Sequence, residues 1–345
     1  MTRRIWSLAV VLLLSLLVAT SFSEIFSNAN KNSASSSDRP PIVIGYSNWA
    51  GWWPWAIAES EGLFAKRGVK VELKWYDDYT QSLENLAAGT IDGNCQTLND
   101  TISFADSAAK GEVVVLVNDN SSGNDKIIAD ASINELEDLK NKDVVLEAGV
   151  VNDFLLSLAL EKEGMKRSDI NIIDIETGAA AAAFAAGHAN AVGVFPPFWL
   201  TALEREGAHE IVSSSAFPGA IPDLLVLTTK LVDERPEEVQ ALVNTWFDIL
   251  EFMEKNPESA DRIMANRAEV SLDQLKLFKS GVEMFDLQQN IEAFDEGDEM
   301  KNLPHAASEI SDFLQYNFNS FDSLPRLSRL FDSRFVRAYS SLTAF

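Results

Sequence analysis

Apolar and polar positions alternate along the first two thirds of the chain in short blocks that are typical of strands followed by helices. Apolar runs of strand length are separated by amphipathic or Ala-rich stretches of helical length. We expect strands at 42–46, 69–75, 93–97, 113–118, 126–129, 143–146, 170–174, 191–194 and 223–229. We expect helices at 54–67, 79–89, 100–111, 133–139, 152–163 and 179–186. This order predicts an α/β fold built from two successive βαβα halves.

The last third of the pattern is almost wholly helical. Helices are expected at 236–255, 257–266, 272–278 and 304–316, and they would pack back on one of the halves. The two halves also contain similar segments: residues 83–93 and residues 180–191 are each predicted to form an Ala-rich helix, a glycine and a short strand. Gly89 and Gly187 stand where a helix end favours left-handed backbone. This similarity predicts two lobes with the same arrangement of helices and strands and a cleft between them.

The first 37 residues read as an export signal and a flexible spacer. Arg3 and Arg4 precede an apolar run at 8–20, and a polar Ser-rich stretch follows up to residue 37. We therefore expect the protein to leave the cytoplasm and to fold from about residue 42. No cysteine follows the apolar run, so a lipid anchor is not expected. The pattern leaves open whether the segment is cleaved or stays as a membrane anchor.

Charge and rare residues exclude several classes of site. The 345-residue chain carries 52 acidic and 28 basic residues, a formal net charge of −24, so nucleic-acid binding is not expected. Its single cysteine, Cys95, cannot form an intramolecular disulfide or a multi-thiolate metal site. Three histidines, His188, His209 and His305, are too widely spaced for a metal pair on one helix. We predict neither a metal site nor a cofactor.

An aromatic cluster follows the first strand. Four of the eight tryptophans, Trp49, Trp52, Trp53 and Trp55, fall within seven residues that also contain glycine and proline. In α/β proteins this edge, where strands end, is where ligands bind. We expect one or two of the four rings to seal the core and the others to form the wall of a ligand pocket.

Motifs along the chain resemble those of the solute-binding proteins of nitrate-, sulfonate- and taurine-type ABC importers. The matching segments are the aromatic-Gly-x-x-Pro after the first strand and the stretches 58–73, 86–92, 136–145 and 183–191. Their order covers the chain from about residue 42 to 318. The resemblance implies a two-lobed periplasmic binding protein fold, a monomer that traps a small molecule and hands it to a membrane permease, and no enzymatic activity.

The resemblance also implies where the lobes divide. Residues 38–123 and 223–320 are expected to form lobe 1, residues 124–222 lobe 2, and residues 321–345 a C-terminal tail that contains four arginines. Hinges are expected near 122–126 and 220–224, where the chain crosses between lobes.

The chain departs from the resembled family where the ligand is expected. Anion-binding members offer glycine followed by serine or threonine at the start of the second-lobe helix, whereas this chain has Glu147 and Asp153 nearby. Their repulsion would cost a bound anion several kcal/mol at low dielectric. We therefore predict a small cationic ligand, with a guanidinium or a protonated amine favoured over a quaternary ammonium. The predicted ligand-binding residues are Trp49, Trp52, Trp53, Asp77, Asp78, Asp100, Glu147, Asn152, Asp153 and Phe195.

Other readings remain open at this point. Asp100 could serve as a helix N-cap, and Asp153 as a favourable acid in the first turn of its helix. The ligand could be an anion such as taurine, a sulfonate or nitrate. A pyrimidine-precursor synthase shares the resembled fold, but it uses a cysteine-rich iron motif that Cys95 alone cannot supply. A sensory module would need a separate signalling protein.

Overall fold

The computed structural model describes residues 39–318 and 327–343, so the predicted export signal and spacer lie outside the described residues up to residue 38. None of the helices in these described ranges is both long and apolar enough to cross a bilayer. Two β-sheets organise the chain from Ile42 onward, and each defines a lobe.

Lobe 1 is built on a six-stranded sheet with the order β11-β4-β10-β3-β1-β2. β1 runs parallel to β2 and β3, whereas β10 lies antiparallel between β3 and β4. The late strand β10 therefore returns the chain to the middle of the first sheet. The strands are β1 (Ile42–Tyr46), β2 (Val71–Trp75), β3 (Gly93–Thr97), β4 (Glu112–Ser121), β10 (Pro222–Thr228) and β11 (Val282–Met284).

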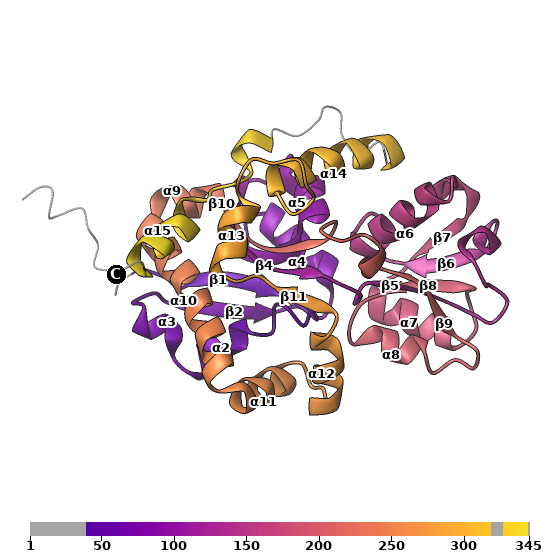
Figure 1. Ribbon diagram of the computed structural model, residues 1–345, viewed down its shortest axis with the longest axis horizontal. Helices are drawn as coiled ribbons and strands as arrows, with labels where there is room; N and C mark the ends of the chain where they lie inside the picture. Colours follow the sequence, from indigo (N-terminus) through magenta and orange to yellow (C-terminus); the bar gives the residue numbers. More distant parts are fainter. Residues whose placement is uncertain (1–38, 319–326, 344–345) are drawn as a thin grey trace, which may run out of the picture. The chain divides into compact units, whose positions relative to one another are not determined.

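Lobe 2 is built on a five-stranded sheet with the order β7-β6-β8-β5-β9. Figure 1 shows α6 on one face of this sheet and α7 and α8 on the other. The strands are β5 (Lys126–Ala129), β6 (Asp143–Leu146), β7 (Asn171–Asp174), β8 (Ala191–Val194) and β9 (His209–Ser213), and the helices are α6 (Val151–Lys162), α7 (Thr177–Ala185) and α8 (Phe198–Ala202).

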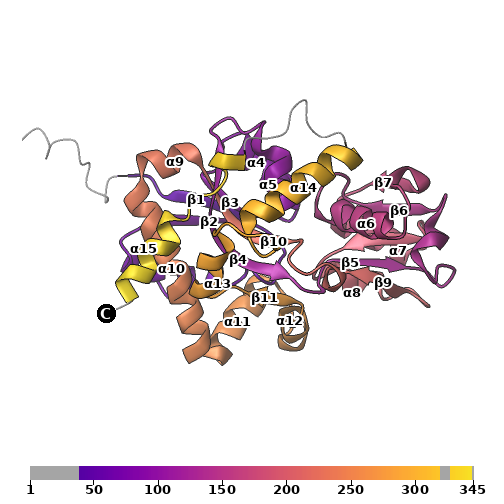
Figure 2. The same cartoon turned by 45° about the horizontal axis from the view of Figure 1, so that its top comes forward.

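Helices of the second half of the chain surround lobe 1, as predicted for the helical region. α10 packs on α2 and α3, and α14 lies on α5 (Figures 1 and 2). The helices of lobe 1 are α2 (Trp55–Ser60), α3 (Leu63–Lys66), α4 (Tyr79–Ala87), α5 (Leu98–Ala105), α9 (Thr229–Glu234), α10 (Pro236–Lys255), α11 (Pro257–Arg267), α12 (Leu272–Lys279), α13 (Leu287–Ala293), α14 (Leu303–Phe318) and α15 (Arg334–Thr343).

The α/β architecture is confirmed, but several predicted elements change. The expected helix at 54–67 breaks into α2 and α3 because Gly62 has a left-handed φ of 65°. The expected helix at 133–139 is only a 3₁₀ turn, Leu136–Leu139. The strands β9 and β11 and the helices α8, α9, α13 and α15 were not predicted. The two predicted helix-ending glycines, Gly89 and Gly187, do adopt left-handed φ values of 68° and 85°.

The C-terminal residues that the structure describes pack on lobe 1. The amide of Val114 donates to the carbonyl of Leu330, and the amide of Asp332 donates back to Val114. On α15, Tyr339 stacks on Phe247 with ring centroids 4.6 Å apart. This end of the chain therefore covers part of the first sheet and α10.

The chain crosses from lobe 1 to lobe 2 between Ser121 and Lys126 and returns between Ser213 and Pro222. The return ends a little earlier than the expected hinge at 220–224, because β10 already begins at Pro222. The hydroxyls of Ser121 and Ser214 lie 2.7 Å apart, and the amide of Gly123 donates to Ser214 Oγ over 2.7 Å. The two crossings are thus tied to each other by hydrogen bonds.

Candidate ligand-binding site

A small cavity lies where residues of both lobes meet. Its volume is about 10 Å³, room for about one water. Lobe 1 provides most of the wall, and lobe 2 adds Val151 and Phe195. The lining residues are Ser47, Asn48, Trp49, Trp52, Tyr79, Thr97, Asp125, Val151, Phe195 and Asp223.

Aromatic rings form several sides of this cavity. Trp49 and Trp52 follow β1 in a turn, and their rings lie 6.2 Å apart between centroids. Tyr79, at the start of α4, lies 5.6 Å from Trp52 and 6.4 Å from Phe195. All four rings are at least nine-tenths buried, so they present desolvated faces to whatever occupies the space.

Carboxyl groups line the floor. Asp119 and Asp223 are register partners on the antiparallel strands β4 and β10, and a β-bulge follows directly at Asp223/Leu224. Bulges re-aim side chains, and they are common beside binding sites. Trp49 Nε1 donates a 2.9 Å hydrogen bond to Asp119 Oδ1, which joins the aromatic wall to the floor. Asp125, on the crossing between lobes, adds a third acid.

No lysine or arginine in the described part of the chain forms an ion pair with these three acids, and burial raises their pKa values. Burial raises the pKa of Asp119 to about 8 and that of Asp125 to about 7. Burial, followed by the charge of Asp119, holds the pKa of Asp223 well above its usual range. The nearby Lys126 is occupied elsewhere, since its ammonium pairs with Glu210 and lies over the Trp199 ring. The floor therefore favours protonated carboxyls when no cation is present.

Asp100 lies one layer behind the cavity. Its Oδ2 accepts from the Tyr79 hydroxyl at 2.8 Å and from the Thr97 hydroxyl at 2.7 Å, and its Oδ1 accepts from Asn99 Nδ2 at 2.7 Å. Thr97, rather than Asp100, caps α5. Asp100 therefore holds Tyr79 and Thr97 in place at the wall.

Glu147 connects the lobes. Its Oε1 accepts a 2.7 Å hydrogen bond from the Thr80 hydroxyl in lobe 1, and its Oε2 accepts a 2.6 Å hydrogen bond from Thr177 in lobe 2. Burial raises its pKa. Glu147 is not among the residues that line the cavity, and both of its oxygens are occupied by these hydroxyls.

Asp153 is paired with a basic residue, which changes the repulsion of anions that the sequence predicts for it. Arg167 donates to both oxygens of Asp153, with Nη2 2.7 Å from Oδ2. Oδ2 also accepts from the Gly149 amide, so Asp153 acts as an acid of the first turn of α6. The pairing lowers the repulsion that Asp153 would exert on an anion. Next to it, Asn152 is fully buried, and its amide has no partner among the described residues.

Three other predicted site residues lie outside the cavity. Trp53 is fully buried and packs edge-to-face on Phe278 at 6.0 Å. Asp77 is exposed and accepts from Trp75 Nε1, and Asp78 caps α4 by accepting from the Gln81 amide. The structure thus brings Trp49, Trp52 and Phe195 to one cavity, places Asp100, Glu147 and Asn152 around it, and leaves Trp53, Asp77 and Asp78 away from it.

The sequence analysis missed most of the lining. The predicted ligand-binding residues did not include Asp119 or the lining residues Ser47, Asn48, Tyr79, Thr97, Asp125, Val151 and Asp223. A signal exists for Asp119 and Asp223, since Asp119 follows the apolar run 113–117 of β4 and Asp223 precedes the apolar run 224–227 of β10. Such acids are costly to bury and often mark a site.

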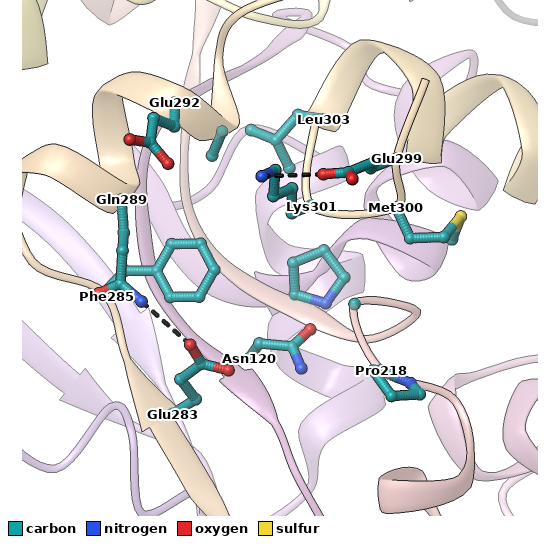
Figure 3. Close-up of a pocket in the computed structure, with 13 residues that line it drawn as sticks. Asn120, Pro218, Glu283, Phe285, Gln289, Glu292, Glu299, Met300, Lys301 and Leu303 are labelled. Carbon is teal, nitrogen blue, oxygen red and sulfur yellow. Dashed lines mark hydrogen bonds and ion pairs between the residues drawn. The ribbon is translucent and has the colours of Figure 1, made fainter. Parts of the chain in front are cut away.

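A larger cavity, of about 370 Å³, lies between β11, α13, the start of α14 and the return crossing. Figure 3 shows the Phe285 ring facing this space, with Glu283 bound to Gln289 and Glu299 paired with Lys301. This cavity also contains Glu292, and unlike the smaller one it combines its acids with a lysine and has a single aromatic ring, Phe285, in its lining.

Comparisons with known proteins agree with this architecture. The sequence model of the NMT1-like family matches residues 35–268. A putative binding protein of Brucella abortus is 28% identical over 238 residues, 68% of this chain and 73% of the relative. The taurine-binding periplasmic protein of Escherichia coli is 23% identical over 221 residues, 63% of this chain and 68% of the relative.

Solved structures show the same fold. The periplasmic aliphatic sulphonate-binding protein of Escherichia coli superposes with a TM-score of 0.68 at 19% identity, covering 85% of this chain and 98% of the other. The periplasmic nitrate-binding protein of Synechocystis gives 0.68 at 14% identity, covering 89% and 90%. A desulfurization enzyme gives 0.60 at 15% identity, covering 87% and 99%. The predicted periplasmic binding protein fold is therefore confirmed, and it also occurs in an enzyme.

Proposed function

The chain belongs to the NMT1-like family, and on that premise we propose that it is an extracytoplasmic solute-binding protein that delivers a small cationic nitrogen compound to an ABC importer. A guanidinium or a protonated amine is the ligand class. Two relatives are named as binding proteins, which supports a role in binding a solute. The export signal in the sequence supports the location, and the ABC permease is the expected partner.

The composition of the cavity lining is the observation that favours a positively charged ligand. Of the described residues that line the small cavity, four are aromatic, two are carboxylic acids and none is lysine or arginine. Aromatic faces attract cations through the ring quadrupole, and buried carboxylates attract them through charge-assisted hydrogen bonds. An anion in this space would meet Asp125 and Asp223 without a compensating positive charge.

The size and shape of the site favour a small planar ligand. The cavity leaves little free space, so its walls must move apart even for a compact molecule. A guanidinium is flat and carries N–H donors around its edge, so one of its faces can stack on Trp49 or Trp52 while its edge meets carboxylates. A quaternary ammonium has no N–H donors and would leave those carboxylates without hydrogen bonds.

An anionic or zwitterionic ligand, such as taurine, a sulfonate or nitrate, is the second candidate. Relatives and structural neighbours are named for such ligands. Trp52 Nε1 lacks an acceptor among the described residues although it is buried at the cavity, so it could donate to an oxyanion. Taurine would present both an ammonium to the acids and a sulfonate to this donor.

A ligand panel distinguishes the two candidates. The purified protein is titrated with guanidinium, agmatine, glycine betaine, taurine and nitrate while its melting temperature and tryptophan fluorescence are recorded. A ligand at 100 times its dissociation constant stabilises the fold by about 2.7 kcal/mol, a readily measured shift. Guanidinium or agmatine is expected to produce it at concentrations far below those that denature proteins. A shift with taurine or nitrate alone would overturn the proposal.

A pair of variants links the response to the cavity. Asp125→Asn removes one charge from the lining and is expected to weaken cation binding at least tenfold. Glu283→Gln removes an acid from the larger cavity and is expected to leave the affinity unchanged. Equal affinities for Asp125→Asn and the unmodified protein would place the ligand elsewhere.

A further inference from the structure

Asp119 and Asp223 form a pair that no basic residue within 39–318 or 327–343 compensates. They face each other in register on β4 and β10, and both are at most 1% exposed. Burial, and then the charge of Asp119, raise the pKa of Asp223, so the pair favours retention of a proton. Asp119 Oδ2 and Asp223 Oδ2 have no donor among the described residues. Asp223 lines the cavity, so its Oδ2 is an acceptor left open there, whereas Asp119 Oδ2 lies against Gly51.

An observation independent of the acids marks the same space as a ligand position. Ser47 lines the cavity and is 2% exposed, yet its hydroxyl has no hydrogen-bond partner in the described part of the chain. Gly51 also lies against the pair, because a Cβ at this position would be 1.9 Å from Asp119 Oδ2. The backbone is therefore packed tightly on one side of the acids, and their open side is the cavity lined by Asp223.

We propose that Asp119 and Asp223 together hold at least one proton in the ligand-free protein and release it to solvent when a cation binds, so that this pair selects a ligand of charge +1 over a neutral molecule of the same shape. The inference rests on the proposed function and adds to it the residues that respond to the charge of the ligand. Before binding, the pair carries at most one negative charge, and after binding two carboxylates face one bound cation.

Electrostatics favour this exchange. Two carboxylates in a desolvated site cannot both ionise cheaply, so the pair retains at least one proton near neutral pH. A bound cation supplies the missing positive charge and favours loss of that proton. A neutral ligand cannot do so, and a carbonyl oxygen in place of an N–H edge would face the carboxylates as a second acceptor.

Other titratable groups face the pair from the surrounding elements. Asp125 on the crossing and Asp100 on α5 add negative charge, and the buried thiol of Cys95 on β3 lies close to both acids. Tyr79 stands on the opposite wall with its hydroxyl bound to Asp100. The charges of Asp125 and Asp100 disfavour a second negative charge on the pair, so a cation is needed to hold both carboxylates ionised.

Proton release can be measured on the unmodified protein. Guanidinium is the suitable probe, because its own proton does not dissociate in the pH range used. Calorimetric titrations at one pH near 6.5, in buffers with different ionisation enthalpies, give the number of protons released per ligand. We expect at least one, and an affinity that rises about tenfold per pH unit below neutrality for each proton released. Guanidinium binding without proton release would overturn the inference while leaving the proposed function intact.

The Asp223→Asn variant tests whether the released proton comes from the Asp119–Asp223 pair. The variant is expected to release one proton fewer than the unmodified protein, to bind guanidinium at least tenfold more weakly and to lose most of its preference for guanidinium over urea. Glu283→Gln is the matched control and should keep the full proton count. Equal counts for Asp223→Asn and the control would assign the proton to another group. Binding of taurine but not of guanidinium would instead refute the proposed function. If Asp223→Asn does not fold, the buffer series on the unmodified protein still decides whether a proton leaves.

Discussion

The hydroxyl of Thr80, in lobe 1, donates a 2.7 Å hydrogen bond to Oε1 of Glu147, in lobe 2. Thr177 occupies the other oxygen from within lobe 2, so the carboxylate is fixed and ready to receive the Thr80 hydroxyl. This contact joins the lobes beside the cavity. Any motion that opens the cavity by separating the lobes would break it, and ligand retention should depend on it.

Thr80→Val tests this contact. The substitution keeps the size of the side chain and removes the hydroxyl, so Glu147 loses one of its two donors. We expect affinity for the ligand to fall about tenfold, or about 1.4 kcal/mol, mainly through faster dissociation. Stopped-flow fluorescence measures both rates. Thr90→Val is the control, because Thr90 bonds only to Asn85 within lobe 1; equal dissociation rates for both variants would show that the contact does not hold the lobes together.

Trp52 is expected to dominate ligand stacking. Its ring lies between those of Trp49 and Tyr79, so Trp52→Ala removes a central aromatic face. Affinity for guanidinium should fall at least tenfold without loss of folding. Trp52→Phe should retain part of the affinity but lose much of the fluorescence response. Trp75→Phe removes a tryptophan outside the lining, and its fluorescence response to ligand should remain. A full response in Trp52→Phe would assign the signal to another ring.

Local patterning was enough to predict the fold and one wall of the site. Strand β1 is a short apolar run, and the glycine and proline after it end the strand, so the position of Trp49 and Trp52 at a sheet edge follows from neighbouring residues. The pattern could not show which rings face inward. Trp52 and Trp53 are adjacent in sequence, yet Trp52 lines the cavity and Trp53 packs on Phe278 from a later helix.

The acids of the floor depend on contacts between distant parts of the chain. Asp119 meets Asp223 only because β10 returns between β3 and β4 and a bulge aligns the two residues. In the same way, the turn after α6 brings Arg167 back to Asp153, and it was this ion pair that removed part of the predicted repulsion of anions. Register and return crossings are set by packing of the whole sheet, which one sequence does not reveal.

The Arg167–Asp153 pair should contribute to folding stability. Asp153 is fully buried, whereas Arg167 is partly exposed, so Arg167→Ala leaves a buried carboxylate with only the Gly149 amide as a donor. We expect a loss of about 1–3 kcal/mol in the free energy of unfolding, measured by urea denaturation. Lys230→Ala breaks an exposed pair with Glu234 and should cost less than about 0.5 kcal/mol. A similar small cost for Arg167→Ala would show that water replaces the arginine.

The ligand-free protein should lose stability as pH rises from about 4 to about 8. Burial raises the pKa of Asp100 and Asp125 to about 7 and that of Asp119 and Glu112 to about 8. In this window the folded state holds protons that the unfolded state has released, so the free energy of unfolding falls with pH. Urea is the denaturant to use, since guanidinium would also act as the proposed ligand.

Glu112 provides the variant for this test because it lies at the start of β4, outside the cavity lining, where Gln96 Nε2 approaches its Oε2 at 3.3 Å. Glu112→Gln cannot take up the proton, so the decline of stability between pH 5 and 7 should be shallower by about 1.4 kcal/mol per pH unit.

Asp130 is a useful contrast, since its hydrogen bonds to Ser132 and Asn190 and the charge of Arg205 lower its pKa below the usual value. Its contribution is therefore complete above about pH 4, and Asp130→Asn should shift the whole curve without changing its slope. If the free energy of unfolding does not change between pH 5 and 8, the pKa values of these buried carboxyls are not raised in solution.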